Sequence, residues 1–425
     1  MIKLDSRYLP RIADAKLALA LQAMGAVLIE GPKWCGKTST AQHIAKSVLY
    51  MQDPDTFEEN MLKAKTKPSL LLEGKTPRLL DEWQVAPVLW NAVRFTVDKR
   101  QETGQFILTG SVVPVRTDDM HSGTGRISKM KMRAMSLYES GESSGEISLR
   151  DIFEGKTDMF GKSKVTLEQI AFILTRGGWP AAVKERNEAL ALKKAFDYYE
   201  AVVNEDISRV DNVEKNPDRV RSLMRSLSRN ISSEASTTTI LKDLLANDES
   251  LSQVTIDQYI NALKMLFVID DLPAWSPSLR SKTAIRTTAK RHFSDPSIAA
   301  AALGANSKRL FDDFCTFGLL FEALCIRDLR IYADSLNANV YHYRDAKGIE
   351  VDAIIQNSDG RWGAVEVKMG AGDIKMAAEN LTKFKANIDT GKIQEPSFLL
   401  VLTATETAFQ MDDGVWVVPL GCLKN

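Results

Sequence analysis

Short apolar runs alternate with helix-like stretches over the first third of the chain. Residues 26–29, 47–51, 78–82 and 105–108 are apolar runs of strand length bounded by turn residues. Residues 39–48, after the first run, have the composition of a helix. Strands that alternate with helices favour a parallel sheet, so we expect an α/β domain over residues 1–150. The Gly- and Ser-rich stretch 140–145 marks its expected end.

The middle of the chain, residues 151–300, is mostly helical in pattern. Apolar positions three and four apart predict helices over 239–245 and 254–263, with a turn between them and a strand over 266–269. This order is that of a winged helix, which can enter a DNA groove. The exposed face of the second helix carries few basic residues, so a structural or protein-binding winged helix is an equal alternative.

The last part, residues 301–425, is again mixed in pattern. A helix is expected over 311–329, and strands are expected over 339–343, 348–355 and 362–368. A turn at 357–360 joins the last two strands as a hairpin. Side chains alternate along a strand, so Glu366 and Lys368 are expected on one face, and Asp352 can share that face. The pattern predicts a second α/β domain.

Composition sets limits on this picture. A chain of 425 residues is expected to form two or three domains, and 44% hydrophobic with 26% charged residues is typical of a soluble globular protein. The 55 basic and 55 acidic residues cancel. Net charge therefore indicates no nucleic-acid partner, although a local basic patch can still provide a binding face.

The location of the protein follows from what the sequence lacks. The N-terminal residues do not read as a signal peptide, and no apolar run approaches the roughly 20 residues that span a bilayer. Cys35, Cys315, Cys325 and Cys422 are scattered without metal-binding spacing, which is typical of reduced thiols. We expect a cytoplasmic protein with no membrane partner.

A phosphate-binding loop follows the first apolar run and precedes the first helix. It reads Gly31, Pro32, Lys33, Trp34, Cys35, Gly36, Lys37, Thr38, and Ser39 continues into the helix. The glycines permit the tight turn that points backbone N–H groups at a triphosphate, and the helix N-terminus adds the positive end of its dipole. Lys37 would reach the β- and γ-phosphates, and the Thr38 hydroxyl would hold Mg²⁺. The sequence contains no guanine-reading tetrad, which favours ATP over GTP.

Acidic and hydroxyl side chains close two other apolar runs. Asp81 and Glu82 end the run 78–82, and Thr109 and Ser111 follow the run 105–108. The carboxyl ends of parallel strands share one edge of a sheet, where ligands bind. Asp81 would complete the Mg²⁺ shell, and Glu82 would orient and polarise the attacking water.

Taken in order, these segments resemble the prokaryotic AAA-like P-loop ATPases whose C-terminal half is a domain of unknown function. The resemblance rests on residues 31–38, 80–87, 106–111 and 123–126, and on the turn at 176–180, which we expect to be a rigid corner. It implies that Gln84 and Ser111 are sensor-type residues. It also implies that Arg126 stabilises charge on the γ-phosphate, with Arg133 as a rival. An arginine supplied by a neighbouring subunit would require self-association.

A second resemblance concerns the C-terminal part. Asp352, Glu366 and Lys368, with Glu322 on the preceding helix, resemble the restriction-endonuclease-like fold and its PD-(D/E)xK motif. In that chemistry Asp352 and Glu366 would bind Mg²⁺, and Lys368 would orient the nucleophile or stabilise developing charge. A degenerate fold that only binds a partner would keep the same pattern, so both interpretations stay open.

The sequence thus predicts an ATPase that uses ATP and Mg²⁺ as a conformational switch. The switch would drive DNA or RNA binding or cleavage. Alternatively, it would serve signalling or assembly with protein partners through a silent C-terminal module, or a DNA-binding regulator acting through the winged helix. Basic residues gather at Arg280, Lys282, Arg286, Lys290 and Arg291. This run is the strongest local candidate for a nucleic-acid contact.

Overall fold

The structure is a computed structural model that describes residues 8–112, 122–211, 213–246, 248, 250–276, 288–345, 348–388 and 393–425. The chain divides into two compact units, of which the first comprises Met1–Ala134, Glu205–Glu214 and Asn261–Val268. The second comprises Met135–Asn204, Lys215–Ile260 and Ile269–Asn425. This division differs from three consecutive domains because the helical middle contributes two short segments to the first unit.

Within the described residues, five parallel strands form the sheet of the first unit in the order β2-β3-β4-β1-β5. The strands are β1 Ala26–Glu30, β2 Ser47–Tyr50, β3 Arg78–Asp81, β4 Phe106–Gly110 and β5 Ile127–Lys131. The helices are α1 Ile12–Ala23, α2 Lys37–Ile44, α3 Phe57–Thr66 and α4 Val88–Arg100. The parallel α/β sheet expected from the sequence is confirmed. The helix expected over 39–48 ends earlier, because Val48 already pairs with Leu79 in the sheet.

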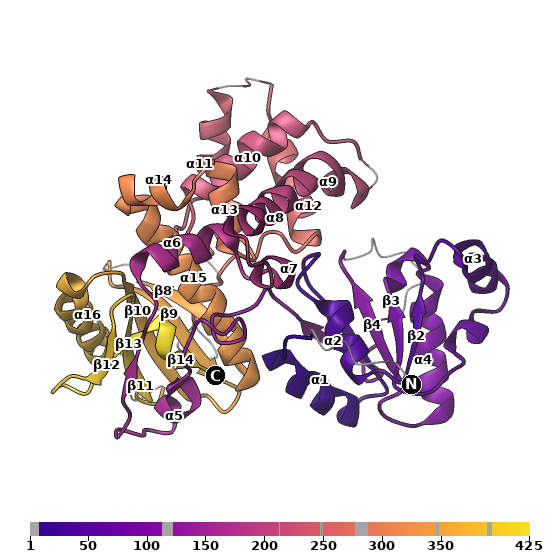
Figure 1. The fold of residues 1–425 in the computed structure, drawn as a ribbon, viewed down its shortest axis with the longest axis horizontal. Coiled ribbons are helices and arrows are strands. Elements are labelled where there is room, and N and C mark those ends of the chain that lie inside the picture. The colour runs from indigo at the N-terminus through magenta and orange to yellow at the C-terminus, as the bar shows by residue number, and fades with distance from the viewer. Residues whose placement is uncertain are drawn as a thin grey trace. The chain divides into compact units, whose positions relative to one another are not determined.

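Apolar side chains cover both faces of this sheet. Leu28, Leu80 and Leu108 form one core with Leu89 and Trp90 of α4. The alternate side chains of β1 point to the other face, where α1 and α2 pack. Figure 1 shows α1 and α2 on one side of the strands and α3 and α4 on the other. A sheet buried on both faces explains why its strands read as continuous apolar runs.

The helical middle contains short helices joined by tight turns. They are α5 Leu149–Phe153, α6 Leu167–Arg176, α7 Pro180–Val183, α8 Glu188–Ala201, α9 Ile207–Arg209, α10 Pro217–Arg229, α11 Thr237–Leu245, α12 Gln253–Met265, α13 Pro296–Leu303 and α14 Ser307–Asp312. The two helices of the expected winged helix are present as α11 and α12. The strand expected over 266–269 is wrong: Phe267 adopts a φ of +57°, which breaks an extended path, and Ile269 makes a single bridge to Phe293.

The turn at 176–180 is a buried corner of the second unit. Trp179 is 1% exposed, stacks on Tyr198 with ring centroids 4.3 Å apart, and donates its Nε1–H to Ser297 Oγ at 3.0 Å. A Cβ on Gly178 would lie 2.2 Å from the carbonyl oxygen of Met135. The close approach requires glycine at this position, so the segment is the rigid packing corner that its sequence indicates.

A mixed sheet forms the C-terminal part of the second unit, in the order β7-β12-β13-β11-β10-β9-β8 among the described residues. Its strands are β7 Gly161–Lys162, β8 Ala338–Arg344, β9 Glu350–Asn357, β10 Trp362–Lys368, β11 Phe398–Thr403, β12 Thr407–Gln410 and β13 Trp416–Pro419. A separate parallel pair joins β6 Ile147–Ser148 to β14 Leu423–Lys424. The three strands β8, β9 and β10 are antiparallel neighbours, and β11 runs parallel to β10.

Two long helices pack on this sheet. They are α15 Phe314–Ser335, which packs along β8, β9 and β10, and α16 Ile374–Asn387, which packs on β10 and β11. Figure 1 shows the sheet between them. Throughout the part of the chain that the structure describes, no helix is both long enough and apolar enough to cross a membrane.

Candidate functional site

The phosphate loop runs from the end of β1 to the start of α2. Gly31 has a φ of +154°, and a Cβ there would lie 2.1 Å from the carbonyl oxygen of Met132. Gly36 has a φ of +99° directly before α2. Both positions therefore favour glycine. The loop stands over the N-terminus of α2, where N–H groups that lack helical partners can bind an anion.

Lys37 is held over the loop that it is expected to serve. It is 5% exposed, and its Nζ donates to the carbonyl oxygens of Gly31 at 2.9 Å and Pro32 at 2.8 Å. A phosphate bound by the loop would offer the ammonium group a charged acceptor, which makes a stronger hydrogen bond than either carbonyl.

Asp81 meets two hydroxyl groups at the carboxyl edge of the sheet. Strand β4 lies between β1 and β3, so Thr109 pairs with Ile29 on one side and with Asp81 on the other. Asp81 Oδ1 accepts hydrogen bonds from Thr38 Oγ1 at 2.7 Å and from Thr109 Oγ1 at 2.6 Å. Carboxylate and hydroxyl oxygens are the hard ligands that Mg²⁺ takes. The residues present therefore fit a magnesium-bound triphosphate.

Glu82 is the next residue, and two side chains hold its carboxylate. Its Oε2 accepts from Ser111 Oγ at 3.1 Å and from Gln84 Nε2. Glu82 has a φ of +54°, a conformation that costs a non-glycine residue on the order of 1–3 kcal/mol. Within the described residues, Gln84 Oε1 is a buried acceptor without a hydrogen-bond partner. The carboxylate thus sits beside an acceptor that a water molecule could satisfy.

The remaining loop residues differ in their surroundings. Cys35 is fully buried, and its thiol contacts the carbonyl oxygen of Met132 at 3.8 Å. Trp34 is 52% exposed, and Ser39 also lies at the surface. Lys33 Nζ lies 2.6 Å from Asp206 Oδ1, an ion pair that sequence reasoning missed. Asp206 ends a π-helical segment, Val202–Asp206, and no local sequence pattern links it to the loop.

Arg11 is another residue that sequence reasoning missed. Its guanidinium donates from Nη1 to the carbonyl oxygen of Cys35 at 2.7 Å and from Nη2 to that of Arg133 at 2.9 Å. It is 7% exposed. Arg11 therefore ties the phosphate loop to the segment after β5, and these contacts join residues that are far apart in the sequence.

Arg126 and Arg133 flank opposite ends of β5. Arg126 precedes β5, whose first residue pairs with Ala26 at the start of β1, and its Nε lies 2.7 Å from Asp98 Oδ1. The phosphate loop leaves the other end of β1, about 13 Å of strand away. Within one chain, Arg126 is thus placed away from the loop. Arg133 follows β5 at the edge that carries the loop.

In the C-terminal part, the structure brings together Asp352, Glu366 and Lys368. The pairing of β9 with β10 ends at Ala353, and Asp352 Oδ2 then accepts the N–H of Val367 at 2.9 Å. Lys368 Nζ lies 2.9 Å from Glu366 Oε2 and 3.8 Å from Asp352 Oδ2. Glu366 is only 4% exposed, so this strand face is buried rather than solvated.

Lys290 enters the same group of side chains, although its sequence context suggested a surface role. It is 1% exposed, and its Nζ lies 3.1 Å from Glu322 Oε1, 3.1 Å from Glu350 Oε1 and 3.2 Å from Asp352 Oδ1. We call these four residues, with Glu366 and Lys368, the carboxylate cluster. The described residues contain no group of three or more His, Cys, Asp or Glu side chains arranged for a metal ion. The ammonium group of Lys290 thus lies against Asp352, one of the two carboxylates expected to bind Mg²⁺.

Burial and charge shift the pKa values within the carboxylate cluster. Burial raises the pKa of Glu366 to about 7 and that of Glu322 to about 8, and the charge of Asp352 adds to both increases. Burial alone would lower the pKa of Lys290, but the charges of Glu322, Asp352 and Glu350 outweigh it and raise that pKa. Lys290 therefore stays charged.

The expected nucleic-acid contact through Lys290 and Arg291 is wrong, because both are buried in internal ion pairs. Arg291 is 8% exposed, and its Nη1 lies 3.1 Å from Asp271 Oδ2. Arg280, Lys282 and Arg286 lie outside the described residues.

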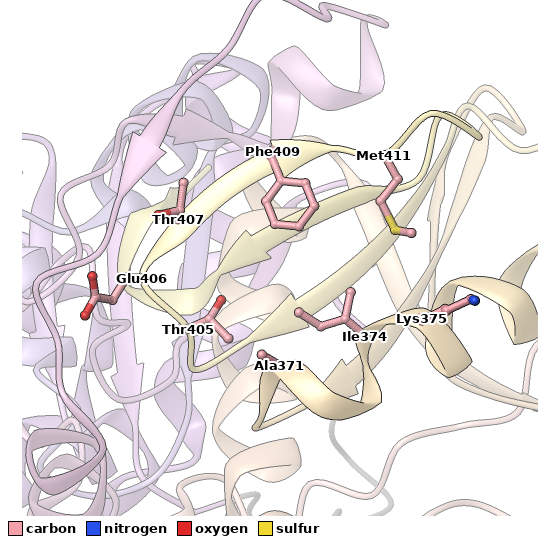
Figure 2. A pocket seen from close by; sticks show the side chains of 8 residues that line it. All are labelled: Ala371, Ile374, Lys375, Thr405, Glu406, Thr407, Phe409 and Met411. Carbon is pink, nitrogen blue, oxygen red and sulfur yellow. The ribbon is translucent and has the colours of Figure 1, made fainter.

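A pocket of about 540 Å³ lies elsewhere in the C-terminal part (Figure 2). It is lined by Ala371, Ile374, Lys375, Thr405, Glu406, Thr407, Phe409 and Met411. Phe409 of β12 and Ile374 at the start of α16 face each other across it in Figure 2. Its walls are mostly apolar, with Lys375 and Glu406 as their charged side chains.

Comparison with family models divides the chain into three matched segments. Residues 24–141 match the AAA domain, 167–309 match a domain of unknown function (DUF8612), and 317–423 match another domain of unknown function (DUF4143). The first match spans the phosphate loop, Asp81, Glu82 and Ser111. This part of the chain is an AAA-like P-loop domain with a parallel sheet, which suggests ATP binding. The restriction-endonuclease-like fold is not among the matches.

Two mycobacterial proteins match most of this chain. The uncharacterized proteins Rv2008c of Mycobacterium tuberculosis and Mb2031c of Mycobacterium bovis are each 23% identical over 367 residues, which cover 84% of this chain and 73% of theirs. Among solved structures, the Walker-type ATPase PABY2304 of Pyrococcus abyssi has a TM-score of 0.42 at 12% identity, covering 70% of this chain and 99% of its own. The RuvB Holliday junction branch migration motor of Thermotoga maritima has a TM-score of 0.25 at 14% identity, covering 61% and 89%.

Proposed function

We propose that this chain binds ATP with Mg²⁺ and hydrolyses it, and that hydrolysis acts as a conformational switch. The observation that carries the proposal is the group formed by Lys37, Thr38, Asp81 and Glu82 at one edge of the sheet, where Asp81 accepts from Thr38 at 2.7 Å. Each residue there has the chemistry that phosphoryl transfer needs, because catalysis of that reaction is mostly positioning and charge stabilisation.

Each residue of the site has its own role in the proposed reaction. Lys37 exchanges its two carbonyl acceptors for phosphate oxygens, and Thr38 and Asp81 hold the ion. Bound Mg²⁺ neutralises charge on the phosphates. Glu82 orients the attacking water and accepts its proton, while Ser111 and Gln84 fix the carboxylate through their hydrogen bonds to Oε2. If these hydrogen bonds break when the nucleotide changes, the position of the Glu82 side chain would depend on which nucleotide is bound.

Two variants test this assignment. Lys37→Ala is expected to lose ATP binding in isothermal titration calorimetry, because the loop loses its cation. Glu82→Gln is expected to bind ATP within about twofold of wild type but to lower the hydrolysis rate by about 10²-fold or more, the usual size of a general-base contribution. Hydrolysis is measured as phosphate release.

A matched control is Lys46→Ala, which removes an exposed lysine just before β2. It is expected to leave binding and hydrolysis unchanged. A Glu82→Gln protein that hydrolyses ATP as fast as wild type would refute the role given to Glu82. ATP binding by Lys37→Ala with unchanged affinity would refute the site itself.

We propose, second, that the C-terminal α/β part is a restriction-endonuclease-like fold that serves as a binding module for a nucleic acid or protein partner. The order of Glu322 on α15, Asp352 on β9, and Glu366 with Lys368 on β10 supports the fold. The ammonium group of Lys290, 3.2 Å from Asp352, favours binding over cleavage. Cleavage of plasmid DNA in Mg²⁺ by wild type that Asp352→Ala lacks would contradict this second proposal.

A further inference from the structure

The carboxylate cluster already holds a cation, and that cation belongs to the chain. Lys290 Nζ lies 3.1 Å from Glu322, 3.1 Å from Glu350 and 3.2 Å from Asp352. An ammonium group has three N–H donors, and each has a carboxylate within hydrogen-bond distance. Each donor of Lys290 therefore has an acceptor, and its charge lies among acidic side chains.

We propose that Lys290 is the resident cation of the carboxylate cluster, that it excludes a divalent ion from Asp352, and that a neutral side chain at position 290 opens a divalent-cation site there. The proposal does not depend on ATP hydrolysis by the first unit.

The first support comes from the occupancy of Asp352. Its Oδ1 faces Lys290, and its Oδ2 accepts the N–H of Val367 at 2.9 Å. A metal ion bound to this carboxylate at the usual 2.0–2.6 Å would have to replace one of these partners. It would also lie close to two ammonium groups, those of Lys290 and Lys368, and the like charges would repel it.

The second support comes from how the backbone of Lys290 is fixed. Its N–H donates to the carbonyl of Leu272 at 2.9 Å, and its carbonyl accepts from the N–H of Leu272 at 2.8 Å. The next residue, Arg291, donates its N–H to Ser233 at 2.8 Å. Two backbone hydrogen bonds to Leu272 thus fix the position of Lys290, which is 1% exposed. Its ammonium group is part of the fold rather than a surface group that happens to lie nearby.

The third support comes from the charges that remain when Lys290 is removed. Lys368 would then remain, 2.9 Å from Glu366 and 3.8 Å from Asp352, while Glu322 and Glu350 would lose the ammonium group 3.1 Å away. Asp352 and Glu366 are buried, and buried carboxylates without a counter-ion are costly, so the cluster would take up a cation or protons. Their oxygens are hard ligands, which select Mg²⁺, Mn²⁺ or Ca²⁺ over softer metals.

The test measures Mn²⁺ binding to the full chain without nucleotide, by electron paramagnetic resonance of free Mn²⁺ at neutral pH. Wild type and Asp352→Asn are expected to bind Mn²⁺ equally, because Asp352 holds no divalent ion. Lys290→Met is expected to bind one more Mn²⁺ ion per chain than wild type does. Adding Asp352→Asn to Lys290→Met should abolish that ion.

The matched control is Lys383→Met, which removes an exposed lysine of α16 and changes the net charge equally. It is expected to gain no ion. A wild-type protein that binds a Mn²⁺ ion which Asp352→Asn loses would overturn the proposal. So would a folded Lys290→Met protein, with unchanged circular dichroism, that gains no ion.

A Lys290→Met protein that fails to fold leaves two readouts. The comparison of wild type with Asp352→Asn still decides whether Asp352 holds a divalent ion. Lys290→Arg keeps a cation among the carboxylates and should bind no Mn²⁺ at Asp352. If Lys290→Arg gains an ion that Asp352→Asn removes, exclusion by the charge of residue 290 is refuted.

Discussion

Glu82 combines a strained backbone with a carboxylate held by two neighbours. Its φ of +54° is uncommon for a residue with a side chain. Thr109 Oγ1 accepts the N–H of Glu82 at 3.3 Å and also donates to Asp81 at 2.6 Å. One fully buried hydroxyl therefore positions both acids of the proposed nucleotide site. Strain that persists at a site is often part of its mechanism, and here it aims Glu82 at Ser111 and Gln84.

His342 is a residue whose surroundings predict a pH response. It is fully buried, and its Nε2 donates to the carbonyl oxygen of Thr288 at 3.0 Å, which requires the neutral ring to carry its proton there. Burial, together with the charge of Lys290, lowers the pKa of His342 from 6.5 to about 4.

Because the pKa of His342 is lower in the folded protein, the protein is expected to lose stability in acid. Above pH 6.5 the imidazole ring is neutral in both the folded and the unfolded protein. Between pH 6.5 and 4 the ring binds a proton in the unfolded protein but stays neutral in the folded protein. Stability is therefore lost as the pH falls from 6.5 to 4, by about 3 kcal/mol for this residue. His342→Gln should reduce the slope of unfolding free energy against pH in this window, measured by urea denaturation. An imidazole that titrates near pH 6.5 in the native protein by NMR would contradict the prediction.

At the scale of elements, the position of β4 between β1 and β3 explains how the nucleotide site is assembled. Thr109 occupies the row that Ile29 and Asp81 share, so β4 delivers hydroxyl groups between the loop strand and the acidic strand. Because these strands run parallel, residues at the starts of the strands lie far from the edge formed by their carboxyl ends.

The placement of Arg126 before β5 gives a prediction. Arg126→Ala is expected to change the hydrolysis rate of a single chain by less than about twofold, since Arg126 lies at the opposite edge and pairs with Asp98. Phosphate release by Arg126→Ala is compared with that by wild type. A fall of about tenfold or more that is reversed by mixing in Lys37→Ala protein would instead indicate an arginine that acts on a neighbouring subunit.

At the scale of the whole molecule, the unit that contains the phosphate loop is not a continuous stretch of sequence. Glu205–Glu214 and Asn261–Val268 are part of it, and Ile207, Leu263 and Val268 in these segments are fully buried. Lys33 in the phosphate loop pairs with Asp206 from the first of them.

A fragment of residues 8–141 should therefore be incomplete. It is expected to have a lower Tm than the full chain and to bind the dye ANS, because loss of both segments exposes apolar surface. Thermal scanning and ANS fluorescence measure the two effects. A fragment with the Tm of the full chain and no ANS signal would contradict the assignment of these segments to the unit.

Local patterns in the sequence predicted much of the first unit. The apolar runs became strands, and residues 31–38 became a phosphate loop, because glycine positions and strand length depend on nearby residues. The expected strand over 266–269 failed, because one residue, Phe267, turns the chain. The contacts of Lys33 with Asp206 and of Arg11 with Cys35 could not be predicted, since no periodicity marks them.

In the C-terminal part, too, the sequence predicts some features and leaves others undetermined. The sequence by itself determined the hairpin of β9 and β10 and the proximity of Asp352, Glu366 and Lys368, because strand alternation and a short turn fix which side chains share a face. Only the tertiary structure decided that Lys290, more than 60 positions before Asp352, brings its ammonium group to 3.2 Å from it. Whether a carboxylate faces a metal ion or a lysine depends on which distant segment packs against it, and spacing along the chain does not carry that information.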